Sequence, residues 1–114
     1  MNDQRPFWVA FNHVTGIGAV RTKLLLERFG TLELAWNANL QDLRMLGIPE
    51  KTIQAFSEFR ETHNPEDIIN SIQARNISVI LSIDEVYPPL LRNIDNPPPV
   101  LYVVGNLPTA DQPM

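Results

Sequence analysis

A turn with two glycines near the N-terminus is the part of this 114-residue sequence best able to bind a ligand through its backbone. Residues 16–18 read Gly-Ile-Gly, and they could present backbone N–H groups at the start of a helix to a phosphate. Two basic side chains and a hydroxyl follow. The candidate phosphate-binding residues are Gly16, Ile17, Gly18, Arg21, Thr22 and Lys23. The alternative is a tight turn whose glycines only allow two helices to pack.

A second turn repeats this pattern and indicates which elements must position the candidate residues. Residues 47–49 read Gly-Ile-Pro, and Gly47 aligns with Gly16 at an offset of 31 residues. Each unit predicts a helix, a tight turn and a second helix, so the region looks like a duplicated helix-hairpin-helix, as in small SAM-like helical domains. Lys51 follows the second turn, but Pro49 has no N–H to offer a phosphate. Lys51 is therefore the weaker candidate.

Hydrophobic spacing predicts five short helices around these turns, which together form an all-α domain over residues 1–62. Their expected first residues or caps are Pro6, Ala19, Thr31, Asn39 and Pro49. The side chains expected to face inward are Phe7, Trp8, Phe11, Val14, Val20, Leu24, Leu25, Ile53, Phe56 and Phe59. Phe29-Gly30 supplies the stop of the second helix.

Residues 63–114 form a second unit, an α/β extension. Asn64 and Pro65 predict the start of a helix, and the β-branched residues 77–83 predict a strand covered on both faces. Residues 84–105 contain five of the ten prolines, one helical turn at 90–94 and a buried strand at 100–104 that stops at Gly105. Two strands joined by a connection that contains a helix predict a parallel pair. The predicted fold class is α+β, and the two strands should keep an unfilled edge and an apolar face.

The charge distribution limits where a nucleic acid could bind. The net charge is −4, and residues 64–114 hold six acidic and two basic groups, whereas residues 1–63 balance seven of each. Because phosphate contacts dominate nucleic-acid affinity, the second half is a poor candidate for binding DNA alone. The neutral first half favours the packing alternative for the glycine turn. The absence of cysteine and of a long apolar run makes a soluble, cytoplasmic protein without membrane contact the default expectation.

The remaining chemistry-bearing residues have structural interpretations. The aromatic side chains could include a base-stacking platform, but their helical spacing favours core packing; they are Trp8, Phe11, Phe29, Trp36, Phe56 and Phe59. His13 is expected at the surface or as a cap, and the carboxylates Asp84, Glu85 and Asp95 in turns. Tyr87 and Tyr102 are expected to pack with their hydroxyls at the surface. No nucleophile–base pair, metal set or cofactor-binding loop is evident, so an enzyme is not indicated.

One longer pattern resembles a known family. The sequence Tyr87-Pro88-x-x-Leu91-x-x-Ile94-x-x-Pro97-x-x-Val100-Leu101-Tyr102-x-x-Gly105 is similar to a segment of the DNA processing protein A family, also called DprA or Smf. The turn at residues 16–18, with Leu24-Leu25 and Phe29-Gly30, resembles the SAM-like N-terminal region of that family. The resemblance covers roughly residues 7–105.

The resemblance implies a function in natural transformation (competence) and DNA recombination. Family members bind and protect incoming single-stranded DNA and assist a RecA-type recombinase, through a Rossmann-like domain that the extension strands would complete. That domain has no counterpart in this sequence, which implies a truncated form, weak or no DNA binding by this region alone and a possible homodimer. The alternative is a protein-interaction or self-association module that never contacts DNA.

Overall fold

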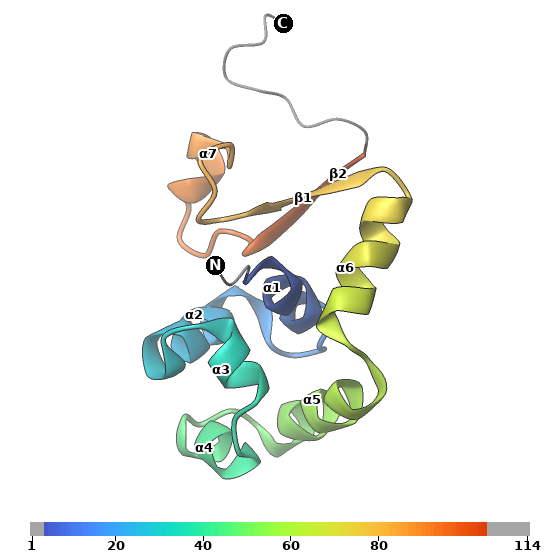
Figure 1. Cartoon of the computed structure of the whole chain (residues 1–114). Coiled ribbons are helices and arrows are strands. Elements are labelled where there is room, and N and C mark those ends of the chain that lie inside the picture. The colour runs from blue at the N-terminus through green and yellow to red at the C-terminus, as the bar shows by residue number, and fades with distance from the viewer. Residues whose placement is uncertain (1–3, 105–114) are drawn as a thin grey trace, which may run out of the picture.

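A computed structural model describes residues 4–104, in which short helices precede a small sheet (Figure 1). The elements are α1 (Arg5–Asn12), α2 (Gly18–Phe29), α3 (Leu32–Trp36), α4 (Leu40–Met45), α5 (Glu50–Thr62), α6 (Pro65–Ala74), β1 (Ile77–Leu81), α7 (Pro89–Arg92) and β2 (Val100–Val104). Gly105 and the residues after it, where the sequence predicted the end of the second strand, lie outside the described residues.

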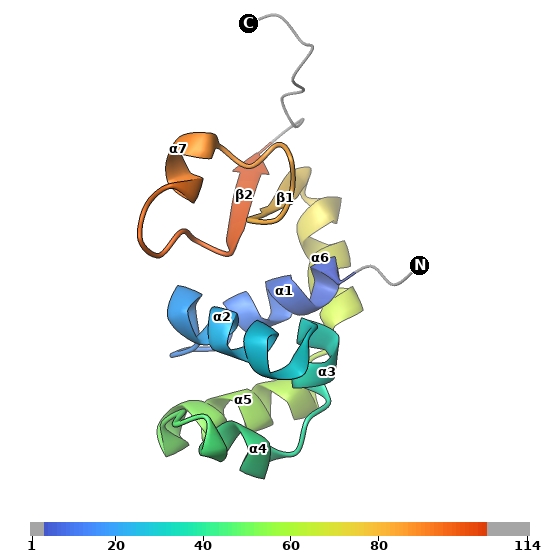
Figure 2. The ribbon, with the colours of Figure 1, turned by 90° about the vertical axis from the view of Figure 1, so that its left-hand side faces the viewer.

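Helix α1 lies at the centre of the molecule, between the sheet and the helices α2 to α5 (Figures 1 and 2). The sequence predicted one apolar stripe on this helix, but Trp8, Val9, Ala10 and Phe11 are all buried. A helix with neighbours on several sides buries consecutive residues, because successive side chains point in different directions around its axis. The packing of α1 against α6 and β2 joins both halves of the chain in one core.

The two predicted hairpins occur, and their buried positions follow the repeat. Ile17 and Ile48 are 2% and 5% exposed, and Leu25 and Phe56, which also align at the same offset, are both fully buried. Val20 was predicted to face inward, but it is 55% exposed because Thr22 and Leu25 occupy the inner face of α2. The packing of the repeat is thus confirmed at its central positions, whereas the prediction that Val20 faces inward is wrong.

Polar side chains fix several helix starts where the sequence placed them. The Thr31 hydroxyl accepts a hydrogen bond from the Leu34 N–H, and the Asn39 and Asn64 side chains accept one from the N–H two residues later. Each cap satisfies a donor that the helix itself leaves unpaired. Pro49 differs by one position from the expectation, because it is the N-cap of α5 and not its first residue.

The two strands are antiparallel, so the prediction of a parallel pair is wrong. Ile77 pairs with Val104 and Leu81 with Val100, and the Ser82 N–H continues the ladder to the Pro99 carbonyl. A parallel crossover needs a connection that carries the chain back along the full strand, usually a helix of three turns. Helix α7 has only four residues, which is too short to carry the chain back along the strand. The chain therefore reverses direction between the strands, as in a β-hairpin with a long connection.

The connection between the strands is held from inside by Tyr87, which contradicts the prediction that its hydroxyl lies at the surface. Tyr87 is 1% exposed and its hydroxyl donates to the Pro98 carbonyl oxygen at 2.8 Å. Burial raises the pKa of this phenol. Rigid prolines at both ends of the connection place the acceptor where the ring can reach it. Tyr102 is half exposed, as expected, and its hydroxyl accepts from Asn12.

An ion pair ties the start of α1 to the turn after β1. Arg5 donates to Asp84 at 2.7 Å and to the Val79 carbonyl oxygen at 3.1 Å, while the Leu81 N–H donates to the same carboxylate. Partial burial raises the pKa of Asp84, but the hydrogen bonds from Arg5 and Leu81 and the Arg5 charge outweigh it and hold the pKa below its usual value. The prediction that Asp84 lies in a turn is confirmed, but the sequence did not predict its ion pair with Arg5.

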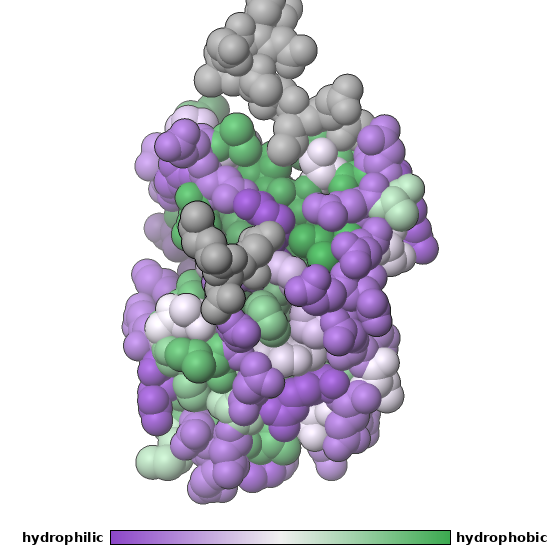
Figure 3. Space-filling model, viewed as in Figure 1, coloured by the Kyte–Doolittle hydropathy of each residue, from purple (hydrophilic) through white to green (hydrophobic). Residues whose placement is uncertain are grey.

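The β end of the molecule leaves apolar side chains in solvent. Strand β1 buries residues 79–81, but it ends at Leu81, and Ile83, which was predicted to belong to it, is 68% exposed. The prediction that the second strand is buried is wrong, because burial alternates along β2 and Val104 is 83% exposed. Leu90 of α7 is 85% exposed. Figure 3 shows hydrophobic residues gathered around the strands on this face of the molecule. The apolar face expected for the extension strands is therefore present on β2.

Candidate nucleic-acid interface: the two hairpins

The first glycine turn packs against the second hairpin. Gly16 has a φ of +95°, and a Cβ atom placed there would lie 2.5 Å from Oγ1 of Thr52 in α5. The contact brings the two turns of the repeat together, with Lys51 exposed beside Thr52 in the chain. Both the backbone conformation and the close approach require glycine at position 16.

The side chains of Ile17 and Thr22 belong to the interior. Ile17 is 2% exposed and Thr22 5%. The Thr22 hydroxyl donates to the Gly18 carbonyl oxygen at 2.7 Å, a bond within α2 that occupies its only proton. A ligand at this turn would therefore meet backbone groups, and neither of these two side chains is turned toward it.

Arg21 and Lys23, the two basic residues near the start of α2, lie on different sides of the helix. Arg21 donates through Nη1 to the Gly16 carbonyl oxygen at 2.6 Å, so part of its guanidinium closes the turn. Lys23 is exposed and lines a cavity of about 230 Å³ together with Trp8 and Asn96, between α2 and the connection that precedes β2. Residues two apart on a helix do not share a face. The structure thus brings Arg21 to the turn but does not place Lys23 beside it.

The start of α2 is open to an anion. Its N-cap residue, Ile17, offers no side-chain hydrogen bond, and its first turn contains no acidic residue. Gly18 is exposed, with no atom within 4 Å of the place where a Cβ would stand. The first N–H groups of a helix carry partial positive charge. Since no carboxylate neutralises it, this end of α2 retains its positive potential.

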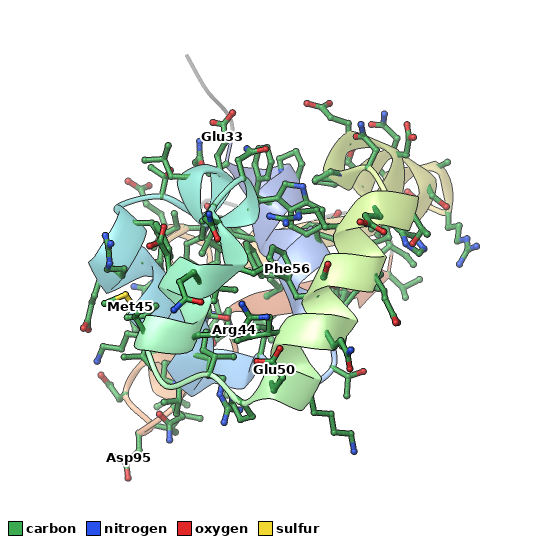
Figure 4. The ribbon with its side chains drawn as sticks, turned by 90° about the horizontal axis from the view of Figure 1, so that it is seen from below. Glu33, Arg44, Met45, Glu50, Phe56 and Asp95 are labelled. Atoms are coloured by element: carbon green, nitrogen blue, oxygen red, sulfur yellow. The ribbon has the colours of Figure 1, made fainter. Side chains whose placement is uncertain are left out.

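The start of α5 is neutralised. Its N-cap is Pro49 and its first turn contains Glu50. Arg44 donates to both carboxylate oxygens of Glu50, each at 2.8 Å, and Figure 4 shows the two side chains next to each other. The hydrogen bond from Arg44 lowers the pKa of Glu50 and keeps its charge in place. The second hairpin therefore offers an anion less than the first.

The interpretation of most aromatic residues as core is confirmed. Trp8, Phe11, Trp36 and Phe56 are buried, and Phe11, Trp36 and Phe56 contact one another at ring-centroid distances of 5.2–5.4 Å. Figure 4 shows Phe56 pointing inward from α5. Phe59 differs, because it is half-buried at the edge of this cluster. Buried rings cannot stack on a base. Of these five aromatic side chains, the buried Trp8 contributes to the cavity beside α2, and the half-buried Phe59 lines a separate surface groove.

The sequence did not predict the groove that Phe59 lines. His13 and His63, fifty residues apart in the chain, both line it. The spacing of Phe59 and His63 by four residues was a signal for a ring pair on one helix face. Nothing local in the sequence links His13 to them. Its surface and capping role is confirmed, because it ends α1 and its Nδ1 lies 2.8 Å from the Val9 carbonyl oxygen.

Within residues 4–104, no cluster of three or more His, Cys, Asp or Glu side chains could hold a metal ion. None of the helices in the same range is both long and apolar enough to span a membrane.

A helical repeat with two glycine turns, joined through one core to a two-stranded antiparallel sheet, defines a small α+β protein. Among curated proteins, the chain is 36% identical over 107 residues to Protein Smf from Synechocystis sp.. The match covers 93% of this chain and 27% of that protein, so the chain spans about a quarter of the length of the relative. No family model and no solved structure matches it. The chain is thus related to the DprA/Smf proteins, which confirms the resemblance first noted in its motifs.

Proposed function

We propose that this chain is part of a DNA-processing protein, and that its first hairpin contacts a DNA phosphate. The relationship to Protein Smf supports the general function. The open start of α2, with no acidic residue and an exposed Gly18, is the observation that supports the contact. In this proposal the N–H groups at Gly18 and beyond bind the phosphate, while Arg21 braces the turn through the Gly16 carbonyl.

The proposal extends to the whole protein of which this sequence would form one region. The helical repeat (residues 1–62) is a SAM-like domain, and the extension (residues 63–114) borders a Rossmann-like domain. That domain binds and protects incoming single-stranded DNA and assists a RecA-type recombinase during natural transformation. The exposed apolar side chains of Leu90 in α7 and Val104 in β2 support such a neighbour, because burial against another domain would remove their apolar surface from water.

Fluorescence anisotropy with labelled single- and double-stranded oligonucleotides tests the proposed contact. Binding should weaken as salt rises, because each phosphate contact releases counterions. Arg21→Ala removes the cation that lies at the turn and should reduce the salt dependence, whereas Arg28→Ala at the far end of the same helix serves as the matched control. Gly18 is a poor site for proline, since its φ of +62° is outside the range that the ring allows. Equal, salt-independent anisotropy for all three proteins would overturn the contact.

The second candidate is a self-association module, which the exposed apolar residue Leu90 favours. A homodimer through the surface around Leu90 would give a mass that rises with concentration in light scattering. Leu90→Lys should abolish that rise. A constant monomer mass at all concentrations would leave the surface to another partner and reject self-association.

A further inference from the structure

A groove on the surface brings together the only two histidines of the chain. It encloses about 420 Å³ and lies between the end of α1, the end of α5 and one face of α6. Its lining includes His13, Phe59, His63, Asp67, Ser71 and Arg75. This volume lies within the range of small-ligand sites. The groove is separate from the glycine turn at residues 16–18, none of which line it.

Three rings stand nearly parallel along the groove. Phe59 and His63 stack with centroids 4.1 Å apart and an angle of 7°, and His13 lies 6.4 Å from Phe59 at 19°. Both imidazoles are exposed, while Phe59 is half-buried against the core. A half-buried ring held by the core fixes the position of the stack, and the exposed imidazoles offer flat faces to a ligand. Such an arrangement is suited to a planar aromatic ring.

Helix α6 supplies polar groups on the opposite wall. Asp67, Ser71 and Arg75 recur every four residues, so they share one face and extend along about 12 Å of helix. Asp67 and Arg75 are exposed, and neither makes a salt bridge with another residue of the described chain. The wall thus presents an acceptor group at one end and an unpaired cation at the other.

We propose that this groove binds an unpaired nucleobase of a single strand, with the base stacked on the imidazole rings and a neighbouring phosphate at Arg75. The flat rings can stack on the π-face of a nucleobase, and the single guanidinium can bind the negatively charged phosphate, so the groove offers a partner to both parts of a nucleotide. Asp67 and Ser71 are positioned to hydrogen-bond the edge of the base. The inference rests on the proposed function, since it names the form of DNA that this region binds, but it concerns a different surface.

The histidines themselves provide the first test. With only two of them in the chain, their ring-proton NMR signals can be assigned with the variant His63→Ser. Titration with deoxyadenosine monophosphate should shift both signals in a saturable way, while deoxyribose 5-phosphate, which lacks the base, should leave them in place. Arg75→Ala should weaken binding of the nucleotide but not of deoxyadenosine. Equal shifts with the base-free phosphate, or no shifts with the nucleotide, would overturn the proposal.

A second experiment separates this inference from the hairpin proposal. Anisotropy is compared for an oligothymidylate and an abasic oligonucleotide with the same number of phosphates. The protein should prefer the oligothymidylate by about five-fold or more, since stacking of one base contributes that much. His13→Ser/His63→Ser should remove this preference and leave abasic binding intact, whereas Arg21→Ala should weaken both ligands equally. An unchanged preference in the double histidine variant rejects the groove. An unchanged abasic affinity in Arg21→Ala rejects the hairpin contact.

Discussion

The two hairpins of this chain share their packing and differ in their charge. Ile17 and Ile48 occupy equivalent buried positions, and so do Leu25 and Phe56. In the first hairpin, the helix after the turn, α2, has no carboxylate in its first turn. In the second hairpin, the helix after the turn, α5, begins with Glu50. The comparison indicates that burial determines the hairpin fold, while a few exposed residues determine whether its helix start attracts an anion. Buried and exposed positions of a repeat can therefore change independently.

The largest expected effect concerns the buried positions, where the two hairpins should behave alike. Phe56→Ala should lower the free energy of unfolding by about 3–5 kcal/mol and Leu25→Ala by about 2–5 kcal/mol, because each leaves a cavity in the core. Phe56 should cost more, since it also stacks on Phe11 and meets Trp36 edge-on. Urea unfolding followed by circular dichroism measures both values. A loss below about 1 kcal/mol at either site would break the equivalence of the two repeats.

The two turn glycines should differ although both have positive φ. Gly47→Ala should cost about 1–2 kcal/mol from backbone strain alone, because a Cβ at its φ of +83° meets no other atom. Gly16→Ala should cost about 2–5 kcal/mol, since its Cβ would also press on Thr52 Oγ1.

A double-mutant cycle isolates that contact. Thr52→Ala removes the closest atom, so Gly16→Ala should be less harmful in the Thr52→Ala background than alone. The same background should not change the cost of Gly47→Ala, which serves as the control. Strict additivity for position 16 would mean that the first turn does not rest on α5.

Much of the helical half could be predicted from the sequence, because its signals are local. Asn39 and Asn64 mark helix starts through hydrogen bonds that span two residues, and the spacing of apolar residues marks the helices themselves. The prediction for Val20 was wrong because the face of α2 that is buried depends on which helices surround it. No pattern within one helix contains that information.

The sheet and the ring groove depend on distant contacts and could not be predicted in the same way. The strand direction follows from how residues 82–99 fold back, which involves the hydrogen bond from Tyr87 to Pro98 and not the presence of a helix in the connection. His13 and His63 line the same groove only because α1 packs on α6 and α5 ends beside them. Arg5 and Asp84 likewise pair across 79 residues.

We expect the Arg44–Glu50 pair at the second hairpin to affect the local charge but to contribute little to the free energy of unfolding, unlike the Arg5–Asp84 pair. Because the folded pKa of Asp84 is depressed, its contribution is present above the unfolded pKa and is lost as the pH falls through the folded pKa. Asp84→Asn should cost about 1–2 kcal/mol at neutral pH and flatten the loss of stability below about pH 4.

Glu50→Gln provides the matched comparison, since Arg44 and Glu50 are 42% and 62% exposed in their side chains. An exposed pair competes with water and costs side-chain entropy, so its removal should leave thermal unfolding unchanged within error. Thermal scans at pH 7 and pH 3 for both variants decide the point. A loss in Glu50→Gln equal to that in Asp84→Asn would show that the second hairpin needs its ion pair to fold.

The smallest expected effect tests the electrostatic difference itself. If the carboxylate in the first turn of α5 weakens anion binding there, Glu50→Gln should make the two hairpins alike and raise DNA affinity by about two-fold at low salt. Arg21→Ala at the first hairpin should lower affinity and reduce the slope of log affinity against log salt by about one. Anisotropy titrations over a series of salt concentrations measure both changes, with Glu58→Gln, farther along α5, as the control for lost negative charge in general. An equal gain from Glu58→Gln would assign the effect to net charge. A gain confined to Glu50→Gln would instead mean that one carboxylate at the helix start accounts for the difference between the two hairpins, because the partial charge of a helix end acts only within its first turn.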